Sequence, residues 1–136
     1  MKKFMLYFSL TLSAIALVIA IIILSNPLRR SEETIRDRLL ELTPIGMSME
    51  DVIKVIESNK SWQIVSISHK FGYVRPGPPD PADYASGKMT IIGEKSIRVS
   101  LGEYRGFWLV SVTAFWGFDK DANLIDVYVW KVGDAL

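Results

Sequence analysis

The sequence predicts an α+β domain in which two helices pack on one face of an antiparallel sheet of about four strands, preceded by an N-terminal transmembrane helix. Three observations predict this architecture. An uncharged apolar run extends from Phe4 to Leu24. Beyond it, apolar residues recur with a helical period, and from Trp62 onward they alternate as in strands. Helices followed by a run of strands are typical of an α+β layer fold.

The apolar run Phe4–Leu24 has the length of a membrane span. At about 1.5 Å per residue, such a helix covers roughly 30 Å, the thickness of a hydrocarbon core. A signal peptide cleaved after Ala16 is the alternative, but the apolar segment Leu17–Leu24 follows that site and would become the new terminus. We therefore predict an uncleaved anchor in residues 1–30 and a globular domain in residues 31–136.

Charge separates these two segments. All 15 acidic residues follow residue 30, whereas four of the 16 basic residues flank the apolar run. The domain therefore carries 12 basic against 15 acidic residues, which argues against a nucleic-acid partner. The basic residues on the two sides of the run are nearly balanced. Because a short N-terminal tail commonly stays in the cytoplasm, we expect a single-pass protein of the cell membrane with an extracytoplasmic domain.

Two amphipathic helices are expected at the start of the domain. Ser31 is the candidate N-cap of the first, and two glutamates follow it in the first turn. Thr43-Pro44-Ile45-Gly46 ends this helix, and Ser48 is the candidate N-cap of the second. The apolar stripes expected to face the sheet are Ile35, Leu39 and Leu42 on the first helix and Met49, Val52, Ile53 and Ile56 on the second.

The strands follow in a meander. Turns at Gly102–Gly106 and Asp119–Asn123 are expected to connect the last three strands. Residues 70–87 are expected to form a loop, which holds four of the six prolines. The predicted strands are Trp62–Ile67, Ser96–Leu101, Phe107–Phe118 and Leu124–Val132, with Met89–Ile92 as a further short candidate.

The composition predicts no metal and no cofactor. The chain has no cysteine and one histidine, which excludes disulfides, thiol chemistry, cysteine-ligated zinc and multi-histidine metal sites. Asp119, Asp121 and Asn123 have the opening spacing of a calcium loop. However, Leu124 and Trp130 stand where glycine and glutamate are required. A hairpin turn is the better interpretation of this segment.

Two stretches resemble the SmpA/OmlA-like envelope proteins, small lipoproteins of the outer-membrane protein assembly machinery. IGMSMEDV (residues 45–52) is similar to the start of that family's second helix, and FDKDANL (residues 118–124) is similar to its closing hairpin. The resemblance implies two helices packed on a short antiparallel sheet, a unit similar to the one repeated in the beta-lactamase inhibitor protein, and a role in outer-membrane assembly. The chain lacks the family's lipid-acceptor cysteine, and Ala122 replaces a turn glycine.

Candidate partner-binding residues lie on the longest strand and in the proline-rich loop. The predicted strand Phe107–Phe118 is apolar on both faces, whereas two helices can cover only one. The second face is then either a binding surface or is covered by the loop. Prolines lower the conformational entropy of the loop, so it can present tyrosine and arginine, which are enriched at interface hot spots. The predicted partner-binding residues are Tyr73, Arg75, Tyr84, Phe107 and Trp108.

These features favour a membrane-tethered, non-catalytic module that binds or scaffolds another envelope protein. An inhibitor or immunity-type module that blocks a target enzyme fits the same features. A small-ligand or catalytic domain using His69 fits them less well. A catalytic histidine needs an orienting acid, and nothing in the sequence places Asp80 or Asp83 of the adjoining loop beside it.

Overall fold

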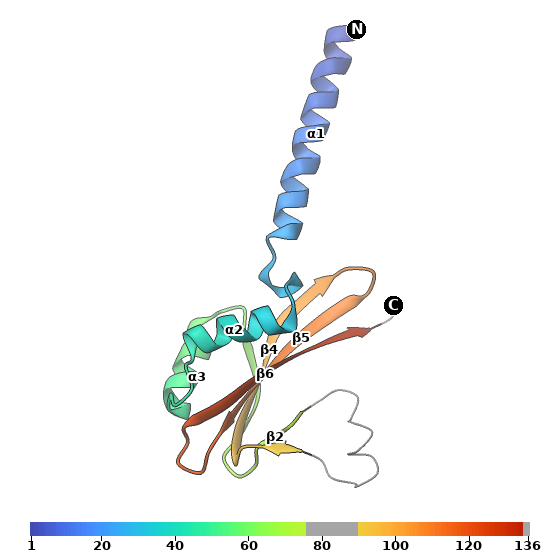
Figure 1. Ribbon diagram of the computed structural model, residues 1–136. Coiled ribbons are helices and arrows are strands. Elements are labelled where there is room, and N and C mark those ends of the chain that lie inside the picture. Colours follow the sequence, from blue (N-terminus) through green and yellow to red (C-terminus); the bar gives the residue numbers. More distant parts are fainter. Residues whose placement is uncertain (76–89, 135–136) are drawn as a thin grey trace.

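The structure is a computed structural model that describes residues 1–75 and 90–134. Tyr84, Met89 and the prolines of the predicted loop lie outside the described residues. Figure 1 shows the elements in sequence colours. They are α1 (Lys2–Leu24), the 3₁₀ turn η1 (Pro27–Arg29), α2 (Glu32–Leu42), α3 (Met49–Ser58), β1 (Gln63–Ser68), β2 (Tyr73–Val74), β3 (Ile91–Ile92), β4 (Lys95–Arg105), β5 (Leu109–Phe118) and β6 (Leu124–Asp134).

The arrangement of these elements confirms the predicted α+β fold. Strands β1, β4, β5 and β6 pair antiparallel in that order and form one four-stranded sheet. Helices α2 and α3 lie against one face of this sheet, which we call the core face (Figure 1). A separate two-stranded ribbon, β2–β3, lies at the end of the sheet away from α1 (Figure 1).

Serine caps start both helices of the domain, as the sequence predicts. The Ser31 hydroxyl accepts the backbone N–H of Thr34 at 3.1 Å, and the Ser48 hydroxyl accepts that of Asp51 at 3.2 Å. Each bond satisfies a backbone donor that the first turn of a helix leaves free. The two helices therefore begin at residues fixed by local sequence.

The core lies between the helices and the sheet, and Trp116 of β5 is at its centre. The Trp116 indole N–H donates to the Thr43 hydroxyl at 3.0 Å, and that hydroxyl donates to the Leu39 carbonyl at 2.7 Å. These buried polar groups are therefore satisfied at the end of α2. The largest fully buried apolar side chains are Trp116, Phe118, Ile56, Ile97, Leu124, Val52, Val99, Val112 and Val127.

The β4–β5 hairpin differs from its prediction. The predicted turn at Gly102–Gly106 is wrong, because β4 continues to Arg105 and β5 begins at Leu109. Gly102 instead forms a bulge: its φ is +126°, and the register with β5 shifts between Ser100 and Gly102. A glycine can take this conformation without ending the strand.

The ribbon β2–β3 replaces part of the predicted loop. Tyr73 pairs with Ile92, and Val74 pairs with Ile91. The Tyr73 ring stacks on Phe115, with 5.4 Å between ring centroids, so the ribbon covers part of the sheet face opposite the helices. A side chain at Gly117 would place its Cβ 3.0 Å from the Tyr73 ring, so a glycine allows this close approach.

Helix α1 is long and apolar enough to cross a membrane, and it is the one such helix among the described residues. None of its side chains is buried against the domain. A membrane anchor and a signal sequence both have this character. Beyond its C-terminal end, η1 leads to α2 and lies against β4, at the end of the sheet nearest α1 (Figure 1).

Candidate functional site

Asp126 on β6 is the centre of a polar and aromatic cluster beneath the ribbon. The Tyr73 hydroxyl donates to Asp126 Oδ2 at 2.6 Å, and the Arg36 guanidinium donates to Oδ1 at 3.0 Å. The Arg75 guanidinium approaches Oδ2 at 3.6 Å and lies 5.0 Å from the centroid of the Tyr128 ring. One carboxylate therefore joins α2, the β2 segment and β6. We call this the Asp126 cluster.

The Asp126 cluster braces the ribbon and is poorly suited to proton transfer. Burial, and secondarily the hydrogen bond to Asp126, raises the pKa of Tyr73 far above its ordinary value. The phenol therefore stays protonated at neutral pH, and its proton is already engaged. Arg36 is engaged a second time, since its Nε donates to the Val127 carbonyl at 2.6 Å.

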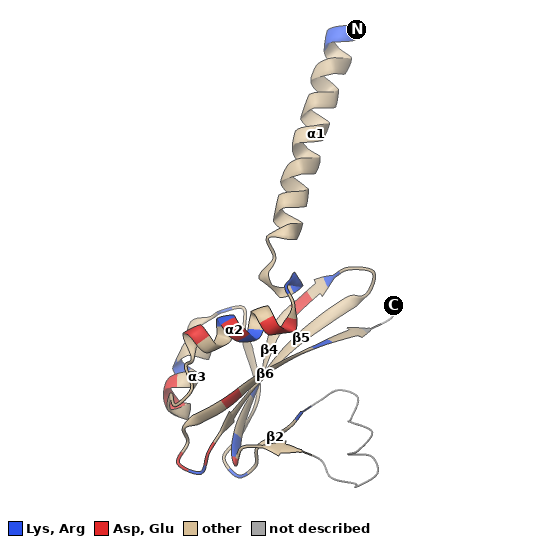
Figure 2. Cartoon of the chain, in the orientation of Figure 1, with Lys and Arg blue, Asp and Glu red and all other residues tan. Residues whose placement is uncertain are grey.

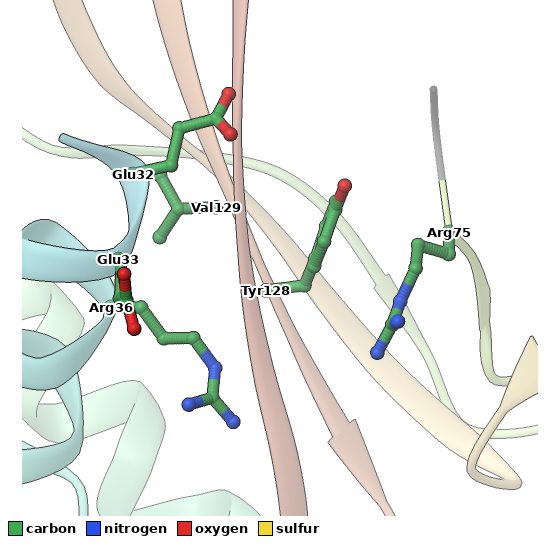
Figure 3. A pocket seen from close by; sticks show the side chains of 6 residues that line it. All are labelled: Glu32, Glu33, Arg36, Arg75, Tyr128 and Val129. Atoms are coloured by element: carbon green, nitrogen blue, oxygen red, sulfur yellow. The ribbon is translucent and has the colours of Figure 1, made fainter. Parts of the chain in front are cut away.

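A pocket of about 330 Å³ lies beside the cluster along the outer edge of β6. In Figure 3, three side chains from α2 lie on one side of this strand, and Tyr128 and Arg75 lie on the other. Both arginines of the pocket already face Asp126, and two glutamates disfavour an anionic ligand. The lining residues are Glu32, Glu33, Arg36, Arg75, Tyr128 and Val129.

Side chains of α2 protect this edge of the sheet. The Glu32 carboxylate accepts the backbone N–H of Lys131 at 2.8 Å, and Arg36 binds the Val127 carbonyl. An unprotected edge strand offers such groups to a foreign strand. The pocket is therefore better explained as a sealed sheet edge than as a ligand site.

The outer side of the ribbon is apolar and exposed. Because residues in a strand alternate between faces, Tyr73 and Ile92 face the sheet and Val74 and Ile91 face away. The exposed fraction is 46% for Val74, 59% for Ile91 and 70% for the neighbouring Phe71. We call these three residues the distal patch. An outward strand face of this kind is normally polar, so the distal patch is a candidate contact surface.

A second exposed apolar group lies at the tip of the β4–β5 hairpin. Phe107 is 95% exposed and Trp108 is 52% exposed, and their ring centroids are 6.2 Å apart. We call this pair the proximal tip, because it lies at the end of the sheet nearest α1 (Figure 1).

The junction between α1 and the domain is held by Lys131 on β6. Its ammonium group donates to the Leu28 carbonyl at 2.6 Å, to the Arg30 carbonyl and to the Tyr104 hydroxyl at 3.3 Å. The Arg29 guanidinium lies 5.1 Å from the centroid of the Tyr104 ring. The chain leaving α1 is therefore clamped to the sheet by charge-assisted hydrogen bonds.

The structure separates the predicted partner-binding residues. Tyr73 was expected at the surface, but it is 5% exposed because its ring packs on Phe115 and its hydroxyl binds Asp126. Arg75 is half-exposed beside it. Phe107 and Trp108 lie at the opposite end of the sheet, and Tyr84 lies outside the described residues.

The sequence did not identify the distal patch, Asp126 or Lys131. Strands β2 (Tyr73–Val74) and β3 (Ile91–Ile92) have two residues each, which is too short to show a strand period. The contacts of Asp126 and Lys131 are made across long sequence separations, for which a single sequence holds no signal. His69 is exposed, and Asp80 and Asp83 lie outside the described residues.

The described residues hold no group of three or more His, Cys, Asp or Glu side chains that could bind a metal ion. The calcium-like stretch is a hairpin turn, in which Asp119 Oδ1 accepts the backbone N–H of Asp121 and of Asn123, each at 2.9 Å. These bonds, above all the one from the Asn123 backbone N–H, hold the pKa of Asp119 below its ordinary value.

The fold and these surfaces define a small α+β domain joined to an apolar N-terminal helix. No family model matches the sequence, and no curated protein and no solved structure matches it at a significant level.

Proposed function

We propose that this chain is a membrane-tethered, non-catalytic binding module whose distal patch contacts another protein of the cell envelope. In this proposal α1 is an uncleaved single-pass anchor, and the domain lies on the extracytoplasmic side. The observation that carries the proposal is the distal patch, in which apolar side chains are exposed on a ribbon that the Asp126 cluster holds rigidly. A rigid apolar surface loses little conformational entropy on binding.

The position of the distal patch favours a protein over a lipid surface. The ribbon lies at the end of the sheet away from α1 (Figure 1). It therefore faces away from the bilayer that α1 would span. Arg75, with a half-exposed guanidinium beside the patch, supplies a polar rim of the kind found around protein interfaces.

Two further observations support a binding role without catalysis. The Tyr73 hydroxyl is engaged by Asp126, and His69 is exposed with no orienting acid among the described residues. A tether raises the local concentration of the domain at the membrane, so weak contacts would suffice. The relationship to SmpA/OmlA-like proteins belongs to this proposal, and the layer of two helices on an antiparallel sheet supports it at the level of fold alone.

Photo-crosslinking in cells tests the proposal. A photo-reactive amino acid would replace Val74 in the full-length chain, with Lys54 on the exposed side of α3 as the matched control site. We expect one discrete protein adduct at position 74 and none at position 54. In the same assay, Phe71→Ser should remove the adduct while the domain stays folded, because the Phe71 side chain is largely exposed.

A second probe site provides the result that would contradict the proposal. Ile91 is the cross-strand neighbour of Val74 on the outer side of the ribbon, so it should give the same adduct. If neither site gives an adduct in cells that need the protein, the binding role of the distal patch is contradicted. His69→Ala would then test the small-ligand role.

A further inference from the structure

The proximal tip has an unusual composition for a hairpin turn. Turns are usually built from glycine, proline, asparagine, aspartate and serine. Here the segment between β4 and β5 contains two aromatic side chains, Phe107 and Trp108, after a single glycine. Exposing two large aromatic rings to water is unfavourable, and neither ring is needed to close the turn.

Contacts at the junction hold the proximal tip next to the end of α1. The Arg29 guanidinium donates to the backbone carbonyl of Arg105, the last residue of β4. The Leu28 side chain packs against the core, and Lys131 binds the Leu28 carbonyl. The hairpin therefore cannot move far from the chain that leaves α1.

The short segment between α1 and Arg29 keeps the contact with Arg105 close to the membrane surface that α1 would leave. Helix α1 ends at Leu24, and Arg29 is five residues further on. Such a segment spans at most about 18 Å when fully extended, and the 3₁₀ turn shortens it. Each polar layer of a bilayer adds roughly 5–8 Å to the hydrocarbon core. The β4–β5 tip, which follows Arg105 directly and lies at the end of the sheet nearest α1, is then within reach of the headgroups (Figure 1).

We propose that the proximal tip inserts into the headgroup region of the bilayer that α1 spans, so that a phospholipid surface is its partner. Tryptophan favours this region because its ring is apolar and its N–H can bind water or phosphate. Exposed guanidinium groups beside the tip suit the lipid phosphates. Figure 2 shows basic residues on η1 and at the end of β4, on the side of α1. These basic residues are Arg29 on η1 and Arg105 at the end of β4, and Arg30 follows η1 directly.

This inference rests on the proposed anchoring by α1 and extends it. A span followed by a flexible linker leaves a domain free to rotate about the membrane normal and to tilt. A second contact at the proximal tip, together with the clamp at Lys131, fixes the tilt. The distal patch would then be held facing away from the bilayer, where a partner protein can reach it.

Single-cysteine labelling of the full-length protein in phospholipid vesicles tests the inference, because the natural chain has no cysteine. Phe107→Cys would carry an environment-sensitive fluorophore, and quenching by a nitroxide on the lipid headgroup would report its depth. Phe71→Cys at the distal patch is the matched control. Quenching at position 107 should exceed that at position 71 by about threefold or more, as expected for a group at the headgroup level.

A third label separates this inference from the anchor on which it depends. Ile15→Cys places the fluorophore in the middle of α1, where a nitroxide on the lipid acyl chain should quench it. If position 15 is quenched and position 107 is no more quenched than position 71, the insertion of the tip is overturned while the anchor stands. If position 15 is not quenched, the proposed membrane anchor and the proposed insertion of the tip are both overturned.

Discussion

The two ends of the sheet expose apolar side chains in different settings. At the distal end, the ribbon is fixed by three side chains that meet on the Asp126 carboxylate. At the proximal end, Phe107 and Trp108 extend from a turn, and among the described residues their side chains make no polar contact comparable to this brace, although the Trp108 ring lies against Gly133. A braced surface is suited to one specific protein partner, whereas an unbraced aromatic pair is sufficient for a fluid lipid surface. The positions of the two ends agree with these two kinds of partner, because the proximal tip lies near α1 and the distal patch lies away from it (Figure 1).

The largest expected effect is at the distal brace. Asp126→Ala removes the partner of the Tyr73 hydroxyl and leaves Arg36 and Arg75 facing each other without the carboxylate. We expect the free energy of unfolding to fall by about 2–4 kcal/mol, mostly from the unpaired buried hydroxyl. Denaturant unfolding of the full-length protein in micelles, followed by tryptophan fluorescence, measures it.

The exposed Asp121 offers the control for this measurement. Asp121→Ala should change the free energy of unfolding by less than about 0.5 kcal/mol. The Asp121 side chain is exposed, and its bond to Asp119 is made by the backbone N–H, which alanine keeps. Equal effects of the two substitutions would show that the Asp126 cluster is not a brace.

The Asp126 cluster should also make the stability of the protein depend on pH in the alkaline range. The pKa of Tyr73 is raised in the folded protein, first by burial and then by Asp126, whereas an unfolded tyrosine titrates near 10. The stability that comes from the protonated phenol is fully present below about pH 10 and is lost as the pH rises above it. Tyr73→Phe should therefore show a weaker loss of stability above about pH 10 than the natural protein. Parallel stability curves for the two proteins would contradict a protonated, buried Tyr73.

A smaller and local effect is expected at the proximal end. Lys131→Met removes the ammonium group that binds the Leu28 and Arg30 carbonyls. Loss of about 1–2 kcal/mol of local stability should raise the rate of tryptic cleavage after Arg30 by roughly tenfold, with little change in global unfolding. Lys120→Met in the exposed β5–β6 turn is the control. An unchanged cleavage rate would show that Lys131 does not clamp the junction.

Local sequence predicted the parts of this molecule that depend on local interactions. The serine caps at Ser31 and Ser48 follow from neighbouring residues, and the structure confirms them. The β5 residues that share one face by strand period, among them Val112 and Trp116, lie in the core. The turn of the β4–β5 hairpin was misplaced because Gly102 can end a strand or form a bulge, and the choice depends on pairing with β5.

The candidate surfaces were less accessible to such reasoning. Tyr73 is buried because it contacts Phe115 and Asp126, which lie far from it in the sequence. Sequence alone could therefore identify Tyr73 as a residue type common at interfaces, but it could not predict that the side chain is buried. Phe107 and Trp108 were predicted as partner-binding residues of a strand, but they lie in the turn before β5 as an exposed aromatic pair. The position of this pair near α1 depends on contacts made by Arg29 and Lys131, which the sequence does not show.

The smallest expected effect concerns a turn that belongs to neither surface. Ala122 has a φ of +63°, a left-handed conformation that costs a residue with a Cβ about 1–2 kcal/mol. Ala122→Gly relieves this cost, but it loosens the unfolded chain and removes a methyl group packed against the core. We expect a net stabilisation of about 0.5 kcal/mol in denaturant unfolding.

Ala122→Val should instead destabilise the protein, because a β-branched residue tolerates this φ poorly. If Ala122→Gly is destabilising, the packing of the methyl group outweighs the backbone strain. If it is stabilising, it provides a background in which Asp126→Ala and Lys131→Met can be compared at the two ends of the same folded domain.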